Sequence, residues 1–536
     1  METDQARLYG IVKAYHEQTK HHPGRYARAL GYMDWENQPL PFRCFEGTAQ
    51  IPLPLSNADR GQSYSALYEP RGGSPDPITL ESIALMLELG MGLSAWKQHG
   101  ASEWALRMNP SSGNLHPTEC YLVLPDLAQQ PACVTHYNPY PHLLEIRASL
   151  DRDQAKWLNG HGGFGVILTS VVWREAWKYG ERAYRYCQHD LGHALAALRF
   201  ACNLNGWQMR MIPQVSETML DRFLGLDRDK MVEGEPEHAD CLCWIDGHQH
   251  DSKEIVQWFG DHKEIDYKNS PNRLSQEHVD WELISMVQQA GCFNSPGFSH
   301  SLPVLSPAAN HLESCFSAET IIRRRRSAQN YERKASRTNL PDFLQALRQT
   351  LPLNACPFDL FPYAAQVHLA LFVHAVEGLE PGLYMFVRNP GHLQSLKDLT
   401  HAKFDWQQVT DALPLYRLEA GDFRASAQSI SCVQAIAGDS AYSLGMLARF
   451  DPVLMEAPYM YPRLFWETGL VGQVLYLEAE ARNLRATGIG CFFDDEMHKI
   501  LGLKNSEWQS LYHFTVGKHL DDSRLETRAP YFHLDR

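Results

Sequence analysis

The chain has 536 residues, of which 44% are hydrophobic and 21% are charged, and its net charge is −14. This length exceeds what one hydrophobic core supports, so we expect two to four domains. The negative charge argues against a general nucleic-acid binder, because neutralising phosphates requires a basic face. The N-terminus is polar and lacks the apolar stretch of a signal peptide, and no run of about 18 apolar residues occurs, so we expect a cytoplasmic protein without a membrane span.

Twelve cysteines are scattered between Cys44 and Cys491 without a C-x-x-C pair. This distribution is typical of reduced thiols in the cytoplasm rather than of a disulfide framework or a zinc site. We therefore expect no metal site.

The first half begins with a helix-like segment around residues 6–17, followed by proline-rich, irregular sequence. Apolar residues at helical spacing predict a helix over 78–89. The next loop holds Ser111, Ser112, Gly113 and Asn114 between Pro110 and Pro117, and it leads into a predicted strand at 121–124. The prolines and the glycine predict a stiff, polar turn whose N–H and hydroxyl groups suit a flat, hydrogen-bonding ligand. An ordinary surface turn is the alternative.

Residues 159–165 show the spacing G-x-G-x-x-G. A dinucleotide-binding loop follows a strand and opens a helix, whereas this glycine run precedes the β-branched stretch 166–172. The sequence therefore predicts a turn before a strand. A long helix with many small apolar residues is expected over 190–203.

The two halves share spaced motifs. Gly192 and Gly225 are separated by 33 positions, as are Gly469 and Gly502, and each pair lies in a similar sequence context. Internal duplication explains this pattern. We predict a first domain over 1–250, a linker over 251–310 that contains one helix near 279–289, and a second domain over 311–536.

The second half contains a basic run, Arg323 to Arg326, that ends at Ser327. Guanidinium groups beside a hydroxyl make a good phosphate clamp, although a basic run is also typical of a solvated face or of a nuclear or nucleic-acid signal. A predicted helix over 470–483 leads to Thr487-Gly-Ile-Gly490, where two glycines allow main chain to approach a ligand. A plain helix C-cap is the alternative, and it needs only one glycine.

The motifs Pro-Ser-Ser-Gly-Asn-x-x-Pro at 110–117, Arg-Arg-Ser at 325–327 and Ala-Thr-Gly-Ile-Gly at 486–490 resemble, in this order, the nitroreductase superfamily of FMN-dependent oxidoreductases. The stretch 177–184 and Asp190-Leu-Gly-His193 resemble its SagB-type dehydrogenase branch, which includes thiazoline and oxazoline (azoline) oxidases. The resemblance covers roughly residues 25–245 and 310–530. It implies an α+β fold with two duplicated domains, each a mainly antiparallel sheet wrapped by helices, that form an intramolecular pseudo-dimer.

The resemblance also implies one FMN per chain, because the two halves are complementary. The first half has the serine loop without the clamp, and the second half has the clamp but reads Pro-Phe-Asp-Leu-Phe-Pro-Tyr at 357–363 in place of the loop. The residues that the family uses for flavin binding map onto Ser111, Ser112, Gly113 and Asn114 for the ring or ribityl chain, Arg325, Arg326 and Ser327 for the phosphate, Thr487, Gly488, Ile489 and Gly490 along the ring, and Lys518 and Arg524 as further basic groups. Gln329 stands where the family often has arginine or lysine.

Lys178 and Tyr179 match the Lys-Tyr pair that azoline oxidases use to remove a proton from carbon. The resemblance therefore implies oxidation of azolines to azoles or a related dehydrogenation of a small molecule or peptide. Two other functions stay open: an NAD(P)H-dependent nitro or quinone reductase, and a non-catalytic docking protein that keeps the fold. A second pairing into a homodimer is compatible with either activity.

Overall fold

The structure, a computed structural model, describes residues 2–534 except 57–58, 129, 229–230, 247–251, 262–264, 266, 268 and 294–312. The described residues form two compact units. We call N-half unit the group from 28–297, 355–362 and 525–536, and C-half unit the group from 1–27, 298–354 and 363–524. None of the described helices is both long enough and apolar enough to cross a membrane.

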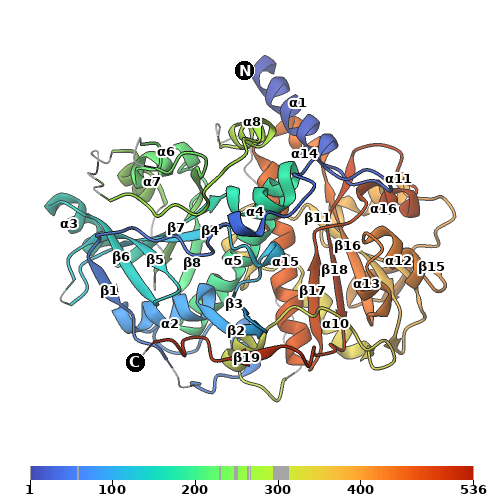
Figure 1. Cartoon of the computed structure of the whole chain (residues 1–536). Coiled ribbons are helices and arrows are strands. Elements are labelled where there is room, and N and C mark those ends of the chain that lie inside the picture. Colours follow the sequence, from blue (N-terminus) through green and yellow to red (C-terminus); the bar gives the residue numbers. More distant parts are fainter. Residues whose placement is uncertain are drawn as a thin grey trace. The chain divides into compact units, whose positions relative to one another are not determined.

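The N-half unit is built on a seven-stranded antiparallel sheet of order β1-β6-β5-β4-β7-β9-β8. Its strands, all but β9 labelled in Figure 1, are β1 (Gln50–Pro52), β4 (Thr118–Leu124), β5 (Cys133–Asn138), β6 (Leu143–Ser149), β7 (Gly163–Val171), β8 (Gln208–Met211) and β9 (Glu237–Asp246). Its helices are α2 (Leu80–Met91), α3 (Arg152–His161), α4 (Trp173–Tyr179), α5 (Ala183–Leu204), α6 (Glu217–Leu224), α7 (Ser252–Gly260) and α8 (Glu282–Ala290). A second, three-stranded sheet joins β2 (Leu93–His99) to β3 (Ser102–Arg107) and to β19 (Glu526–Arg528) near the C-terminus.

The C-half unit repeats this plan with a sheet of order β14-β15-β13-β11-β16-β18-β17, also antiparallel throughout. Its strands are β11 (Val367–Val373), β13 (Gly382–Phe386), β14 (Gln407–Thr410), β15 (Leu413–Ala420), β16 (Tyr442–Arg449), β17 (Arg485–Ile489) and β18 (Trp508–Gly517), with a short parallel pair β10 (Thr338–Asn339) and β12 (Val376–Glu377). Its helices are α1 (Glu2–Gln18), α9 (Ala318–Arg324), α10 (Leu340–Gln349), α11 (Leu393–Leu399), α12 (Arg424–Ile430), α13 (Ala435–Asp439), α14 (Asp451–Glu456), α15 (Met460–Ala481) and α16 (Asp494–Leu501).

The predicted α+β class is confirmed, and the two halves repeat one plan, as the predicted duplication implies. In each half a helix of 22 residues, α5 or α15, precedes an edge strand, a helix of 8 residues and a central strand of 10 residues. Gly192 and Gly469 occupy the same position within their long helices, and Gly225 and Gly502 both end the shorter helix in the left-handed conformation, with φ of 67° and 79°. The repeated 33-residue spacing therefore reports a repeated helix–strand–helix unit.

Both chain ends pack away from their own half of the sequence. Helix α1 lies in the C-half unit, where Tyr9 donates to Asp451 at 2.8 Å and Lys13 pairs with the same carboxylate at 2.9 Å. The last residues lie in the N-half unit, where β19 pairs with β2. Within the predicted linker, the described helices α7 and α8 lie in the N-half unit. The predicted domain boundaries at residues 250 and 311 stay a prediction, because the two units are defined by contacts in space and not by position in the sequence.

The long helices extend further than predicted at their N-terminal ends. Helix α5 begins at Ala183 rather than Asp190, and α15 begins at Met460 rather than Leu470. Every residue of both helices is buried, including the polar ones. A helix surrounded by protein has no solvent-facing side, so its sequence lacks the polar stripe from which periodicity locates a start.

Close packing between α2 and α5 depends on Gly90. A Cβ placed there would lie 2.7 Å from Cδ2 and 3.3 Å from Cα of Leu198, and the Cα cannot rotate aside. We expect Gly90→Ala to lower the free energy of unfolding by about 1–3 kcal/mol through overpacking, measured as a lower Tm.

Gly10→Ala is the matched control, because Gly10 lies inside α1 and a Cβ there meets nothing within 4 Å. This control should gain stability from helix propensity. Equal Tm changes for the two variants would contradict the close α2–α5 contact.

Candidate active site

The serine loop of the N-half unit adopts a compact turn with three residues at positive φ: Gly113 at 59°, Asn114 at 60° and His116 at 51°. Asn114 donates to the carbonyl of Ala105 at 2.9 Å, and its amide oxygen bonds the His116 ring at 2.9 Å. The His116 N–H donates to the Ser111 hydroxyl at 2.8 Å. Non-glycine residues in this conformation are strained, and the internal hydrogen bonds hold them there.

Lys178 and Tyr179 lie directly against this loop. A Cβ added to Gly113 would lie 2.7 Å from the Tyr179 hydroxyl and 3.1 Å from the Lys178 Nζ. Both side chains come from the last turn of α4 and are partly exposed. The structure thus brings together the loop and the pair that the sequence placed about 65 positions apart.

Two buried carboxyl groups, which sequence patterns did not predict as site residues, support the loop. The backbone N–H of Ser112 donates to both oxygens of Asp190 at 3.0 and 3.1 Å, and its hydroxyl donates at 3.1 Å. The Ser111 hydroxyl lies 3.5 Å from Oε1 of Glu175. Glu175 is fully buried and Asp190 nearly so. The available signal was an acid one helical turn before Lys178, inside an aromatic-rich helix.

The two acids cannot both ionise easily. Burial raises the pKa of Asp190 to about 7, although hydrogen bonds from Ser111 and Ser112 oppose the rise. Burial raises the pKa of Glu175 well above its usual range, the nearby Asp190 raises it further, and Lys178 opposes the rise. Two close carboxyls in a dry environment share protons for this reason. The pair therefore holds a proton near neutral pH, next to the Lys178 amine.

In the C-half unit the structure joins the arginine–serine run to the glycine-rich segment. Ser327 pairs as a β-bridge with Ala486, and the Thr487 hydroxyl donates to the Ala328 carbonyl at 2.6 Å. The Tyr476 hydroxyl links the two segments, because it lies 2.8 Å from the Ser327 hydroxyl and accepts the Gly488 N–H at 3.0 Å. Tyr476 lies on α15 and was not predicted, since an aromatic residue in a buried helix usually belongs to the core.

Arginine side chains crowd this junction. Burial lowers the pKa of Arg326 to about 9, and the guanidinium groups of Arg325 and Arg485 lower it further, with Glu480 opposing. Burial is also the main cause that lowers the pKa of Arg325. Arg485 pairs with Asp521 at 2.9 Å, but its Nε is buried without a hydrogen-bond partner among the described groups. Such a donor set fits an anionic phosphate, which would offset the repulsion between the arginines.

The remaining predicted residues differ in their surroundings. Ile489 buries its side chain in the core of the unit, so only its main chain is available to a ligand. Lys518 donates to the Asn483 carbonyl at 3.2 Å, close to the arginines. The Arg524 side chain is 74% exposed and pairs with Asp522 at 2.7 Å, while Gln329 is exposed and Gly490 is partly buried.

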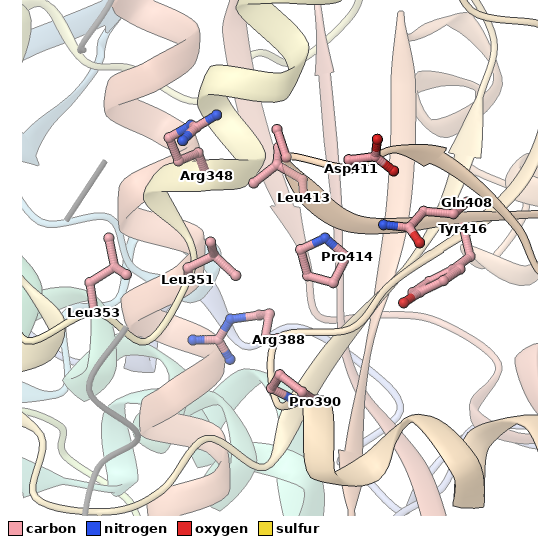
Figure 2. A pocket seen from close by; sticks show the side chains of 11 residues that line it. Arg348, Leu351, Leu353, Arg388, Pro390, Gln408, Asp411, Leu413, Pro414 and Tyr416 are labelled. Atoms are coloured by element: carbon pink, nitrogen blue, oxygen red, sulfur yellow. The ribbon is translucent and has the colours of Figure 1, made fainter. Parts of the chain in front are cut away.

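Two cavities lie apart from the predicted flavin residues. One of about 390 Å³ in the C-half unit is drawn in Figure 2, where Arg388 lies beside Pro390. Arg388 has a structural task, because it donates to the carbonyls of Thr350 and Val367 and pairs with Glu467. The other cavity, of about 780 Å³ in the N-half unit, is lined by residues of α4 and α8, among them Trp173, Ala176 and Ile284.

Comparison with known proteins locates this site in a family. The model of the nitroreductase family matches residues 71–234 and 449–518, which include the serine loop, Lys178, Asp190 and the glycine-rich segment. The chain carries a nitroreductase family domain. A candidate nitroreductase from Anabaena variabilis superposes with a TM-score of 0.69 at 20% identity, over 95% of this chain and 99% of its own, which establishes a nitroreductase fold.

Two further solved structures match with low scores. A candidate nitroreductase from Ralstonia eutropha gives a TM-score of 0.28 at 15% identity, over 41% of this chain and 98% of its own. The E. coli microcin synthetase McbBCD complex with truncated pro-MccB17 bound gives 0.27 at 15% identity, over 46% and 94%. Scores this low carry no argument about fold or function. No curated protein matches the chain.

The acid pair makes stability depend on pH. Because the pKa of Asp190 is about 7 in the folded protein and about 4 when unfolded, the folded state binds more protons between these values. The free energy of unfolding should therefore fall as pH rises from about 4 to about 7, by up to about 4 kcal/mol, and then level off.

Asp190→Asn should remove most of this fall, because it removes the carboxyl whose pKa burial raises. Urea unfolding at several pH values measures it. Glu282→Gln, at an exposed position of α8, is the control and should keep the wild-type profile. An unchanged profile in Asp190→Asn would show that this carboxyl is not the source of the pH dependence.

Proposed function

We propose that the protein is an FMN-dependent oxidoreductase that binds one flavin per chain, because the serine loop and the arginine–serine clamp each occur once in the sequence. The observation that carries this proposal is the group of arginines in the C-half unit, which fits an anion and adjoins the glycine-rich segment. The Ser-Ser-Gly-Asn loop occurs only in the N-half sequence, and the clamp occurs only in the C-half sequence. The family match supports the flavin, because proteins of this family typically bind one.

Different side chains bind the phosphate and hold the two segments together. Arg325, Arg326 and Arg485 bind the phosphate, while Ser327 and Tyr476 fix the clamp against the glycine-rich segment. A bound flavin supplies hydride transfer through its ring, so the protein needs only to bind, orient and tune it. Where a flavin is bound, the serine loop would hold its ring, as the resemblance implies for residues 111–114.

The substrate reaction that we propose is a two-electron dehydrogenation, with an azoline or a related ring in a small molecule or peptide as substrate. Such a reaction removes a proton from carbon as well as a hydride. The Lys178 Nζ accepts that proton, Tyr179 positions the amine, and the Glu175–Asp190 pair beside it keeps a proton in reserve. The position of Lys178 against Gly113 supports this role, since Gly113 belongs to the loop proposed to hold the ring.

The clamp predicts a phosphate-dependent affinity. Arg326→Met should weaken FMN binding by about 10- to 100-fold, because a charged hydrogen bond contributes about 1.5–3 kcal/mol. Binding of riboflavin, which lacks the phosphate, should change little. Quenching of flavin fluorescence measures both affinities.

Arg337→Met is the matched control, since Arg337 is exposed in the same unit and donates to the Lys334 carbonyl. It should leave the FMN affinity near the wild-type value. Equal FMN affinity for Arg326→Met and wild type would show that Arg326 does not bind the phosphate. A protein that takes up no flavin at all would overturn the proposed function.

Substitution of Lys178 distinguishes the proposed oxidase from the alternative reductase. Lys178→Met should lower the turnover of a thiazoline-containing peptide by about 10²-fold or more, as expected for loss of a general base, with FMN affinity unchanged. Product formation by mass spectrometry and fluorescence titration measure the two effects. Full turnover in Lys178→Met, or rapid flavin reduction by NADPH alone, would instead support the NAD(P)H-dependent reductase.

A further inference from the structure

Two of the twelve cysteines, Cys432 and Cys491, come together in the C-half unit. They are 59 positions apart in the sequence, yet their sulfur atoms lie 2.7 Å from each other. Both are partly exposed, whereas seven of the twelve cysteines are buried. Exposed thiols are the reactive ones in proteins, because buried thiols do not reach oxidants or exchange partners. This pair was not visible in the sequence, which has no C-x-x-C spacing.

The backbone around Cys432 is strained. Cys432 and Val433 follow α12 with φ of 51° and 61°. A β-branched residue at positive φ is a genuine outlier, and such strain persists where the surrounding structure imposes it. The Gln434 side chain donates to the Cys491 carbonyl at 3.1 Å and ties this turn to the end of the glycine-rich segment. The strained turn thus presents one thiol to the other.

The other thiol lies next to the proposed flavin segment. Cys491 directly follows Gly490, at the end of the segment that leaves β17. Tyr26 lies beside the pair, and its hydroxyl bonds Cys432. The phenol ring is 54% exposed, so solvent reaches this corner of the unit. A small soluble disulfide can therefore approach both sulfurs.

We propose that Cys432 and Cys491 form a redox-active dithiol that closes to a disulfide by exchange with a low-molecular-weight disulfide. One cysteine thiolate attacks a sulfur of the oxidant RSSR, forming a mixed disulfide and releasing RS⁻. The second cysteine thiolate then attacks the protein sulfur of that mixed disulfide, which releases another RS⁻ and forms the Cys432–Cys491 bond. Two thiols are oxidised, one RSSR is reduced to two RSH, and the two protons pass from the cysteines to the released thiolates.

Closure has a consequence for the flavin segment that rests on the proposed function. The disulfide fixes residue 491 to the 431–434 turn, so the neighbouring Gly488 to Gly490 lose freedom. A more ordered segment changes the affinity for a flavin bound along it, because conformational entropy that is lost when the disulfide forms is not lost again on binding. The redox state of the pair therefore regulates flavin affinity.

The test uses the full-length protein, first reduced and then incubated with oxidised glutathione. We expect a mass lower by two hydrogens and a peptide that links Cys432 to Cys491. Cys432→Ser should instead accumulate a glutathione adduct at Cys491. Cys315→Ser is the control, because Cys315 is exposed, and it should still form the linked peptide.

Absence of the linked peptide, with glutathione found only as adducts, would overturn the dithiol. FMN titration of the oxidised and the reduced protein tests the coupling, for which we expect affinities that differ by about threefold or more. Equal affinities in the presence of the linked peptide would overturn the regulation. Failure of both forms to bind FMN would count against the proposed function, while the linked peptide would still establish the dithiol.

Discussion

The hydrogen bonds from Ser112 to the buried Asp190 fix the part of the molecule on which the site depends. Asp190 lies on α5, a helix buried along its whole length, so the anchor for the loop is rigid. The loop it anchors has three residues at positive φ, and Gly113 leaves room for Lys178 and Tyr179. Without the anchor the strained turn would relax and the two side chains would lose their common neighbour. Function is placed on a loop, but its geometry comes from a buried helix.

Duplication explains why the two halves differ where they do. Each half keeps the features that hold the fold: the seven-stranded sheet, the long buried helix and the glycine that ends the shorter helix. The segment of the second half that replaces the serine loop has another task, because Asp359 forms an ion pair with Arg199 of α5 at 2.7 Å within the N-half unit. A duplicated chain needs only one copy of each functional segment. The spare copy can take on a structural contact without loss of the fold.

The sequence predicted most of the fold. Periodicity located α2 and the strands β4 and β7, and the repeated glycine spacing located the duplication. It did not locate the starts of α5 and α15, whose residues are buried on all sides. Sequence patterns also did not predict the roles of Glu175 and Tyr476, the support that Asp190 gives the serine loop, or the contact between the two cysteines. These residues act through contacts between segments far apart in the chain, and no local pattern records such contacts. Asp359 is a similar case, because its partner lies 160 positions away.

Each unit holds ionisable groups that their neighbours do not fully neutralise. In the N-half unit these groups are acids, and in the C-half unit they are arginines. In the N-half unit two buried acids keep a proton because ionising both would place like charges together. In the C-half unit arginines crowd around Gly488 although like charge disfavours them, and a chain of net charge −14 has no general need for such a cluster. Retaining either arrangement costs stability unless something repays it. An anionic ligand bound among the arginines would offset the cost in the C-half unit, because it would neutralise guanidinium groups that repel one another.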